Sequence, residues 1–106
     1  MLSFKVFKDY LGKAISGVDY VPRGLLDLNE YFRHNGSIKF IYHNEGSLIV
    51  AVSENFRFGS LITHGKDMKE LDRNIKDAIL TAFEIPSAYA LEAKIKNETE
   101  QEYALA

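Results

Sequence analysis

Residues 67–85 read Asp67-Met-Lys-Glu-Leu-Asp-Arg-Asn-Ile-Lys-Asp-Ala-Ile-Leu-Thr-Ala-Phe-Glu-Ile85, and this pattern is typical of one long helix. Asp67 is placed to accept hydrogen bonds from the free amide groups of the first turn, and Glu70 completes a start like a capping box. Apolar residues recur every three or four positions on one face: Met68, Leu71, Ile75, Ala78, Ile79 and Ala82. Charged residues take the opposite face, and Pro86 cannot continue the helix. We expect an amphipathic helix of about five turns that needs an apolar surface to pack on.

The surface for this helix is predicted in the residues just before it. Alternating or β-branched apolar residues indicate three strands, at residues 38–42, 47–53 and 60–64. Asn44-Glu45-Gly46 indicates a tight turn between the first two strands, and residues 54–59 make the second connection. The predicted fold is α+β, a three-stranded antiparallel meander covered by the long helix.

The order of these elements resembles the HicB-type antitoxin domain. The typical family pattern is an Asp-Gly turn, a proline-rich loop, a T-x-G-D-T segment and a helix of the type E-E-A-x-x-N-A-x-E-A-I. The residues of this chain at the matching positions are Gly46, Thr63, Gly65, Glu70, Asn74, Ala78 and Ile79. The chain departs from the family at residues 54–59, which contain no proline, and at Lys66-Asp67. The resemblance covers about residues 37–96.

This resemblance implies a β-β-β-α-β order and a function. A HicB-type protein is an antitoxin that neutralises a HicA-type toxin, a small basic RNA-cleaving protein, by protein contact over the active site of the toxin. Many such proteins carry a DNA-binding ribbon-helix-helix or helix-turn-helix after this domain. The residues after Pro86 are few and become acidic, so we do not expect direct DNA binding.

Length and composition indicate one folded domain. The chain has 106 residues, 46% hydrophobic and 26% charged, which is ordinary for a single domain. The absence of cysteine excludes disulfides and thiolate metal sites and fits a reducing cytosol. No apolar run reaches the ~20 residues of a membrane span, and the first residues lack the apolar core of a signal peptide. We therefore expect a cytoplasmic protein that does not enter a membrane.

Residues 1–36 are predicted to form an N-terminal extension of two short helices. Apolar spacing indicates the first helix at residues 6–15, although residues 2–6 also fit a short strand, and the second at residues 24–32. His34-Asn-Gly-Ser37 marks a turn after the second helix. The second helix lacks the cluster of Arg, Asn, Gln or Lys that reads DNA bases. We expect the extension to pack on the sheet or on a second subunit.

The segment after Pro86 gives two competing signals. Residues 87–96 alternate as in a fourth strand, but their Ala, Leu, Glu and Lys content equally fits a helix. The resemblance favours the strand, and the predicted HicB-like domain therefore extends over residues 37–96. Residues 97–106 are predicted to be a solvated acidic tail.

The sequence contains no constellation typical of catalysis or of cofactor binding. His43 and His64 end predicted strands near Glu45, but a metal site needs three or four converging ligands. No serine lies in a nucleophile-elbow pattern, and the glycines are isolated rather than arranged in a phosphate-binding loop. We interpret the chain as non-enzymatic, without a cofactor or a metal.

Binding to a protein partner is the predicted function. The loop Phe56-Arg57-Phe58 combines the residue types that dominate interface hot spots, although such aromatics also fold back over sheet edges. Acidic residues on loops and on the exposed helix face can pair with Lys or Arg of a basic toxin. The predicted partner-binding residues are Glu54, Phe56, Arg57, Phe58, Asp72 and Asp77.

Two other functions and one assembly state are also considered. The chain can be a stand-alone homo-oligomeric HicB-like domain, or a module that stacks single-stranded nucleic acid on its loop aromatics. The formal charge of −2, however, creates no field that attracts nucleic acid. We expect a homodimer in either case, because an unpaired sheet edge invites a second chain.

Overall fold

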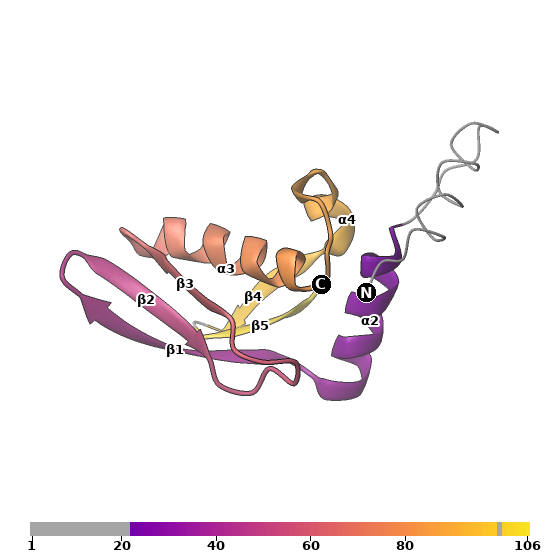
Figure 1. Cartoon of the computed structure of the whole chain (residues 1–106), viewed down its shortest axis with the longest axis horizontal. Coiled ribbons are helices and arrows are strands. Elements are labelled where there is room, and N and C mark those ends of the chain that lie inside the picture. Colours follow the sequence, from indigo (N-terminus) through magenta and orange to yellow (C-terminus); the bar gives the residue numbers. More distant parts are fainter. Residues whose placement is uncertain (1–21, 100) are drawn as a thin grey trace.

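The computed structural model describes residues 22–99 and 101–106, and this part of the chain has an α+β fold (Figure 1). The predicted helix at residues 6–15 lies outside the described residues. The elements in chain order are α2 (Arg23–Asn35), β1 (Ile38–Glu45), β2 (Leu48–Ser53), β3 (Ile62–Gly65), α3 (Met68–Ala82), the 3₁₀ turn η1 (Ser87–Tyr89), α4 (Ala90–Ala93), β4 (Ile95–Thr99) and β5 (Glu102–Leu105). No helix among them is long and apolar enough to cross a membrane.

The five strands form one antiparallel sheet in the order β3-β2-β1-β5-β4. The predicted meander is confirmed by β1, β2 and β3, with β2 between the other two. Glu45 pairs with Leu48, so the loop that joins β1 to β2 consists of Gly46 and Ser47. Gly46 has a φ of 62°, a left-handed backbone that a two-residue hairpin requires and that glycine adopts without a Cβ clash.

The start of α3 follows the predicted capping pattern. Asp67 Oδ1 accepts a hydrogen bond of 2.8 Å from the Glu70 amide, and Glu70 Oε1 accepts one of 2.6 Å from the Lys66 amide. In a capping box the carboxylate at the position of Glu70 would accept a hydrogen bond from the amide of the cap residue, Asp67. Here it accepts from the amide of Lys66, one residue earlier. Leu71, Ile75 and Ile79 are fully buried, while Met68 is exposed at the helix end.

α3 ends before Pro86, at a residue whose backbone has a left-handed conformation. Glu84 has a φ of 57°, its amide donates to Thr81 O, and the Ile85 amide donates to Leu80 O. These two hydrogen bonds form a Schellman motif, in which Leu80 and Ile85 are both buried. The helix therefore ends at Ala82, three residues before the predicted end.

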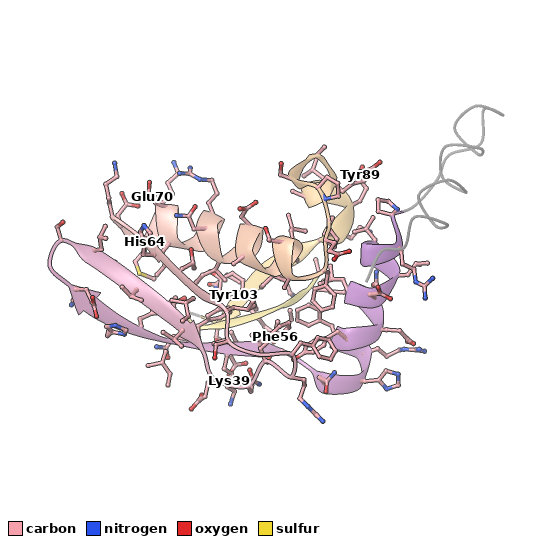
Figure 2. All side chains as sticks on the ribbon, viewed as in Figure 1. Lys39, Phe56, His64, Glu70, Tyr89 and Tyr103 are labelled. Atoms are coloured by element: carbon pink, nitrogen blue, oxygen red, sulfur yellow. The ribbon has the colours of Figure 1, made fainter. Side chains whose placement is uncertain are left out.

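The junction between β3 and α3 brings a strand end and a helix into direct backbone contact. A Cβ at Gly65 would lie 2.5 Å from the Leu71 backbone nitrogen, so only glycine fits there. Asn74 Nδ2 donates a hydrogen bond of 2.7 Å to the His64 carbonyl oxygen. Figure 2 shows His64 and Glu70 at this end of the helix. The junction fixes α3 across one face of the sheet, over β3 and β2 (Figure 1).

The prediction of a strand over residues 87–96 is wrong for its first part. Residues 87–93 form η1 and α4, and only from Ile95 does the chain run as a strand. The apparent alternation included Leu91, which is 88% exposed and belongs to no apolar face. Helix-forming residues 90–93 determine the local structure instead, until Lys94 turns the chain with a φ of 58°.

The prediction of an acidic tail at residues 97–106 is also wrong. Residues 95–99 and 102–105 form the hairpin of β4 and β5, and β5 lies beside β1 in the sheet. Tyr103 pairs with Ile38 and is only 1% exposed. Glu98 is exposed and Glu102 is half-buried, and the glutamates in the sequence obscure the alternation around the buried Tyr103. From β1 onward, the order of the main elements is therefore β-β-β-α-α-β-β, with η1 between the two helices, rather than β-β-β-α-β.

The helix predicted at residues 24–32 is confirmed as α2, which continues to Asn35. Its buried residues follow helical spacing and join the same core as α3: Leu25, Leu28, Tyr31 and Phe32. The helix packs beside α4 and β5, as Figure 1 shows at one end of the sheet. The second helix of the predicted extension thus contributes to the main core.

A hydrogen bond between Tyr103 and Asp72 connects β5 to α3. Tyr103 Oη donates to Asp72 Oδ1 at 2.6 Å, and burial together with this bond raises the pKa of Tyr103 above its usual 10.0. We expect Tyr103→Phe to lower the free energy of unfolding by about 1.5–3 kcal/mol, because the bond is made to a carboxylate. Urea unfolding at neutral pH measures this, and equal stabilities would contradict it.

The same bond predicts a loss of stability in alkali. The unfolded chain loses the Tyr103 proton near pH 10.0 while the folded chain keeps it, so this contribution is complete below that pH and declines above it. The slope for one group is about 1.4 kcal/mol per pH unit. We expect Tyr103→Phe to lose stability less steeply than the unmodified protein above pH 10.0. Urea unfolding on both sides of that pH tests the difference, and parallel curves would contradict it.

Candidate interaction surface

The loop between β2 and β3 folds back onto α2 through its aromatic side chains. The ring centroid of Phe56 lies 5.2 Å from that of Tyr31 and 6.0 Å from that of Phe83, in edge-on or tilted arrangements. Phe56 is half-buried by these contacts and packs against the core, at the position labelled in Figure 2. The sequence left open whether the loop aromatics are exposed anchors or fold back to cover the protein. Phe56 folds back and covers the core.

Phe58 belongs to the same cluster but faces solvent. Its centroid lies 5.6 Å from that of Phe56 and 5.4 Å from that of Tyr31, yet 72% of the residue is exposed. The ring is thus held from one side and open on the other. A group that is already ordered loses little conformational entropy when a partner covers it. Phe58 is therefore the best-placed of the predicted anchors.

Arg57 is tied to the end of α2 by both its backbone and its side chain. The Arg57 amide donates to Tyr31 Oη at 3.0 Å, and its guanidinium donates from Nη1 to Asn35 Oδ1 at 3.1 Å. Asn35 in turn donates from Nδ2 to the Tyr31 carbonyl oxygen at 3.0 Å. These bonds hold the Arg57 guanidinium at the C-terminal end of α2, on the surface.

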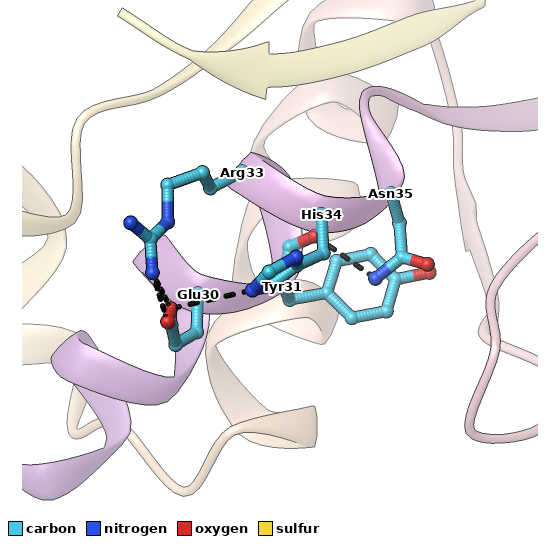
Figure 3. A network of polar contacts seen from close by, with 5 residues as sticks. All are labelled: Glu30, Tyr31, Arg33, His34 and Asn35. Atoms are coloured by element: carbon cyan, nitrogen blue, oxygen red, sulfur yellow. Dashed lines mark hydrogen bonds and ion pairs between the residues drawn. The ribbon is translucent and has the colours of Figure 1, made fainter.

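Figure 3 shows a polar network on α2, which includes Glu30, Arg33 and His34. Glu30 accepts a hydrogen bond from Arg33 and lies 3.7 Å from His34 Nε2. The Arg33 hydrogen bond lowers the pKa of Glu30 below its usual 4.5, so this carboxylate stays ionised. A shallow groove of about 400 Å³ runs between this network and Phe58. We call the groove and its flanks the loop surface, which consists of Asp27, Glu30, His34, Arg57 and Phe58.

The six residues predicted for partner binding do not form one surface. Glu54, Phe56, Arg57 and Phe58 lie on the β2–β3 loop, whereas Asp72 and Asp77 lie on α3 (Figure 1). Asp72 accepts the Tyr103 hydrogen bond and pairs with Lys76 Nζ at 3.1 Å, so it serves the fold. Asp77 and Glu54 are exposed at separate places.

His43 and His64 lie on the same face of the sheet but not side by side. Val50 of β2 pairs with His43 on one side and with His64 on the other, so a whole strand separates the two rings. His43 Nε2 lies 3.3 Å from Glu45 Oε2. Over residues 22–99 and 101–106, no three His, Cys, Asp or Glu side chains are grouped closely enough to hold a metal ion.

An apolar patch on the far side of the sheet was not expected from the sequence. Ile41, Val52 and Ile62 pair in one row across β1, β2 and β3, and their side chains point away from α3. Ile41 is 51% exposed and Ile62 is 65% exposed. Residues 47–53 are β-branched and mostly apolar, which is typical of a central strand. The sequence predicts one long helix on the three-stranded meander, however, and one helix covers only one face of a sheet. This prediction was the signal in the sequence for an exposed apolar face.

No family model matches the chain, and no curated protein and no solved structure matches it either. The resemblance to the HicB-type domain therefore stays a prediction, based on the seven residues at matching positions. Three of them, Gly65, Glu70 and Asn74, make the contacts of the β3–α3 junction. Gly46 forms the hairpin loop.

The different burial of Phe56 and Phe58 predicts different effects on stability. We expect Phe56→Ala to lower the free energy of unfolding by about 2–3 kcal/mol, less than a fully buried ring because Phe56 is half-buried. Phe58→Ala should cost at most about 1 kcal/mol, since only its edge-on ring contacts are lost. Urea unfolding of both variants checks this, and equal losses would contradict the assignment of the two rings.

Proposed function

We propose that this chain is a HicB-like antitoxin-type protein, which binds a small, basic, RNA-cleaving toxin and neutralises it by protein contact. The observation that carries the proposal is the β3–α3 junction. Gly65, Glu70 and Asn74 are residues of the resemblance, and all three act at this one place. Their common physical role, to dock the helix on the strand end, explains why they occur together in a domain of this type.

The loop surface supplies the contact that a basic partner needs. Phe58 offers an ordered, exposed ring, and aromatic side chains in such positions dominate binding energy at interfaces. Asp27 and Glu30 line the groove beside that ring. These carboxylates pair with Arg23 and Arg33 in the free chain, and in the proposed complex they are shared with Lys or Arg of the toxin. Neutralisation then needs no reactive group in this chain, because a bound protein excludes RNA sterically.

The same surface fits single-stranded nucleic acid less well. Stacking of bases would use Phe58, and Arg57 could contact one phosphate. The carboxylates of the groove do not decide between the two partners, because Asp27 is paired with Arg23 and Glu30 with Arg33. A basic protein partner is favoured because the whole chain has a formal charge of −2, which gives no field that attracts nucleic acid.

Affinity purification of the tagged chain from its own cells, at low and at high salt, tests the proposal. We expect a small basic protein to be recovered with it, in smaller amounts at high salt because the charges are screened. The separated partner should cleave RNA, and adding the chain back should stop the cleavage. Recovery of the chain alone, or of a partner without RNA-cleaving activity, would contradict the proposed function.

Two variants then test the loop surface. We expect Phe58→Ala to raise the concentration needed for half-maximal inhibition by about thirtyfold, the size of a hot-spot loss. Leu91→Ala is the matched control, since Leu91 is 88% exposed on α4 and should leave inhibition unchanged. An RNA-cleaving partner that Phe58→Ala inhibits as well as the unmodified chain would keep the function but exclude this surface.

A further inference from the structure

A groove of about 700 Å³ lies between α2 and the β4–β5 hairpin, away from the loop surface. One wall is the side of α2 that carries Leu26, Asn29 and Arg33, and the opposite wall carries Ala104 and Leu105 of β5. Leu26 is 56% exposed, whereas the other large apolar residues of α2 are buried in the core. The groove is therefore a partly apolar surface that the described part of the chain leaves open.

The segment 6–15, which precedes α2 in the chain, has the pattern of an occupant for this groove. Its apolar residues are spaced as on one face of a helix of about three turns: Val6, Phe7, Tyr10, Leu11, Ala14 and Ile15. With a rotation of about 100° per residue, Lys8 and Lys13 fall at the two borders of that face. A helix this short is marginal in water by itself, so it needs a surface that covers its apolar face.

The connection to α2 allows the segment to reach the groove of its own chain. Residues 16–22 separate the segment from Arg23, and seven extended residues span at most about 23 Å. A ten-residue helix is about 15 Å long, which is also the length of α2 from Arg23 to Arg33. Gly17 follows the segment, and a turn there returns the chain antiparallel to α2, as in an αα-hairpin. The point of attachment and the length both fit the groove.

The charges of the segment and of the groove are opposite. Residues 6–15 contain two lysines and one aspartate, a net charge of +1. The groove is lined by Glu30, Glu98 and Arg33, a net charge of −1. Arg33 pairs with Glu30, whereas Glu98 makes no ion pair with the residues that the structure describes. Glu98 is thus the carboxylate that is available to Lys8 or Lys13.

We propose that residues 6–15 form an amphipathic helix that packs in this groove, antiparallel to α2. The helix covers Leu26 and Leu105 with its apolar face and forms an αα-hairpin with α2. The segment is then part of the folded domain rather than an arm that binds a partner. The inference does not depend on the proposed toxin contact, and neither of its tests uses a toxin.

Disulfide trapping tests the placement of the segment, because the chain has no cysteine of its own. Antiparallel packing brings residue 11 level with Leu26. We expect Leu11→Cys with Leu26→Cys to form an intramolecular disulfide at least about tenfold faster than Leu11→Cys with Asp27→Cys. Asp27 is the matched control, since it is the next residue of α2 but lines the groove on the other flank of the helix. Equal rates for the two pairs would overturn the proposal, as would disulfides that join two chains.

Hydrogen exchange of the full chain tests whether the groove orders the segment. We expect the amides of residues 10–15 to exchange at least about tenfold more slowly in the unmodified chain than in Leu26→Asp, which places a charge in the groove. Leu91→Asp is the control, with the same substitution at an exposed leucine of α4, and it should leave these amides protected. Protection of the α3 amides in each variant shows that the domain is folded. Equal exchange of residues 10–15 in the unmodified chain and in a folded Leu26→Asp variant would overturn the proposal.

Discussion

The close backbone contact between Gly65 and Leu71 is the constraint on which the rest of the fold depends. With no Cβ at Gly65, the end of β3 can lie directly against the first turn of α3. The Asn74 side chain then donates a hydrogen bond to the His64 carbonyl oxygen, and the Glu70 carboxylate accepts one from the Lys66 amide. These contacts leave the chain little freedom in how the helix crosses the sheet. The burial of Leu71, Ile75 and Ile79 follows from that placement.

Some polar groups that could suggest function make hydrogen bonds that stabilise the fold instead. Asp72 receives the Tyr103 hydrogen bond that holds β5 against α3, and Tyr31 Oη accepts the Arg57 amide. Among residues 22–99 and 101–106, the loop surface around Phe58 and the outer face of the sheet are exposed to solvent. The sequence marks the aromatic loop, but it cannot tell which ring faces solvent. That depends on Tyr31 and Phe83, which arrive from two other elements.

The meander and the long helix can be predicted because their signals are local. Alternation at residues 38–42 and the cap at Asp67 are complete within a few positions. The end of α3 could not be predicted from the sequence, because the residue with the left-handed backbone is Glu84 rather than glycine. β5 could not be predicted for a different reason. Its four residues lie in a glutamate-rich segment and become a strand by pairing with β1, far away in the sequence.

Hydrogen exchange of Gly65→Ala, with Ser60→Ala as a control on an exposed loop position, tests the role of the β3–α3 junction most directly. A methyl group at Gly65 must push the strand end away from Leu71, an overpacking that costs about 1–3 kcal/mol. We expect the protection factors of the amides of α3 and β3 to fall together, by the factor that corresponds to this loss of free energy. Ser60→Ala should leave these protection factors unchanged. Protection of α3 as high in Gly65→Ala as in the unmodified chain would contradict the proposed dependence of the fold on this contact.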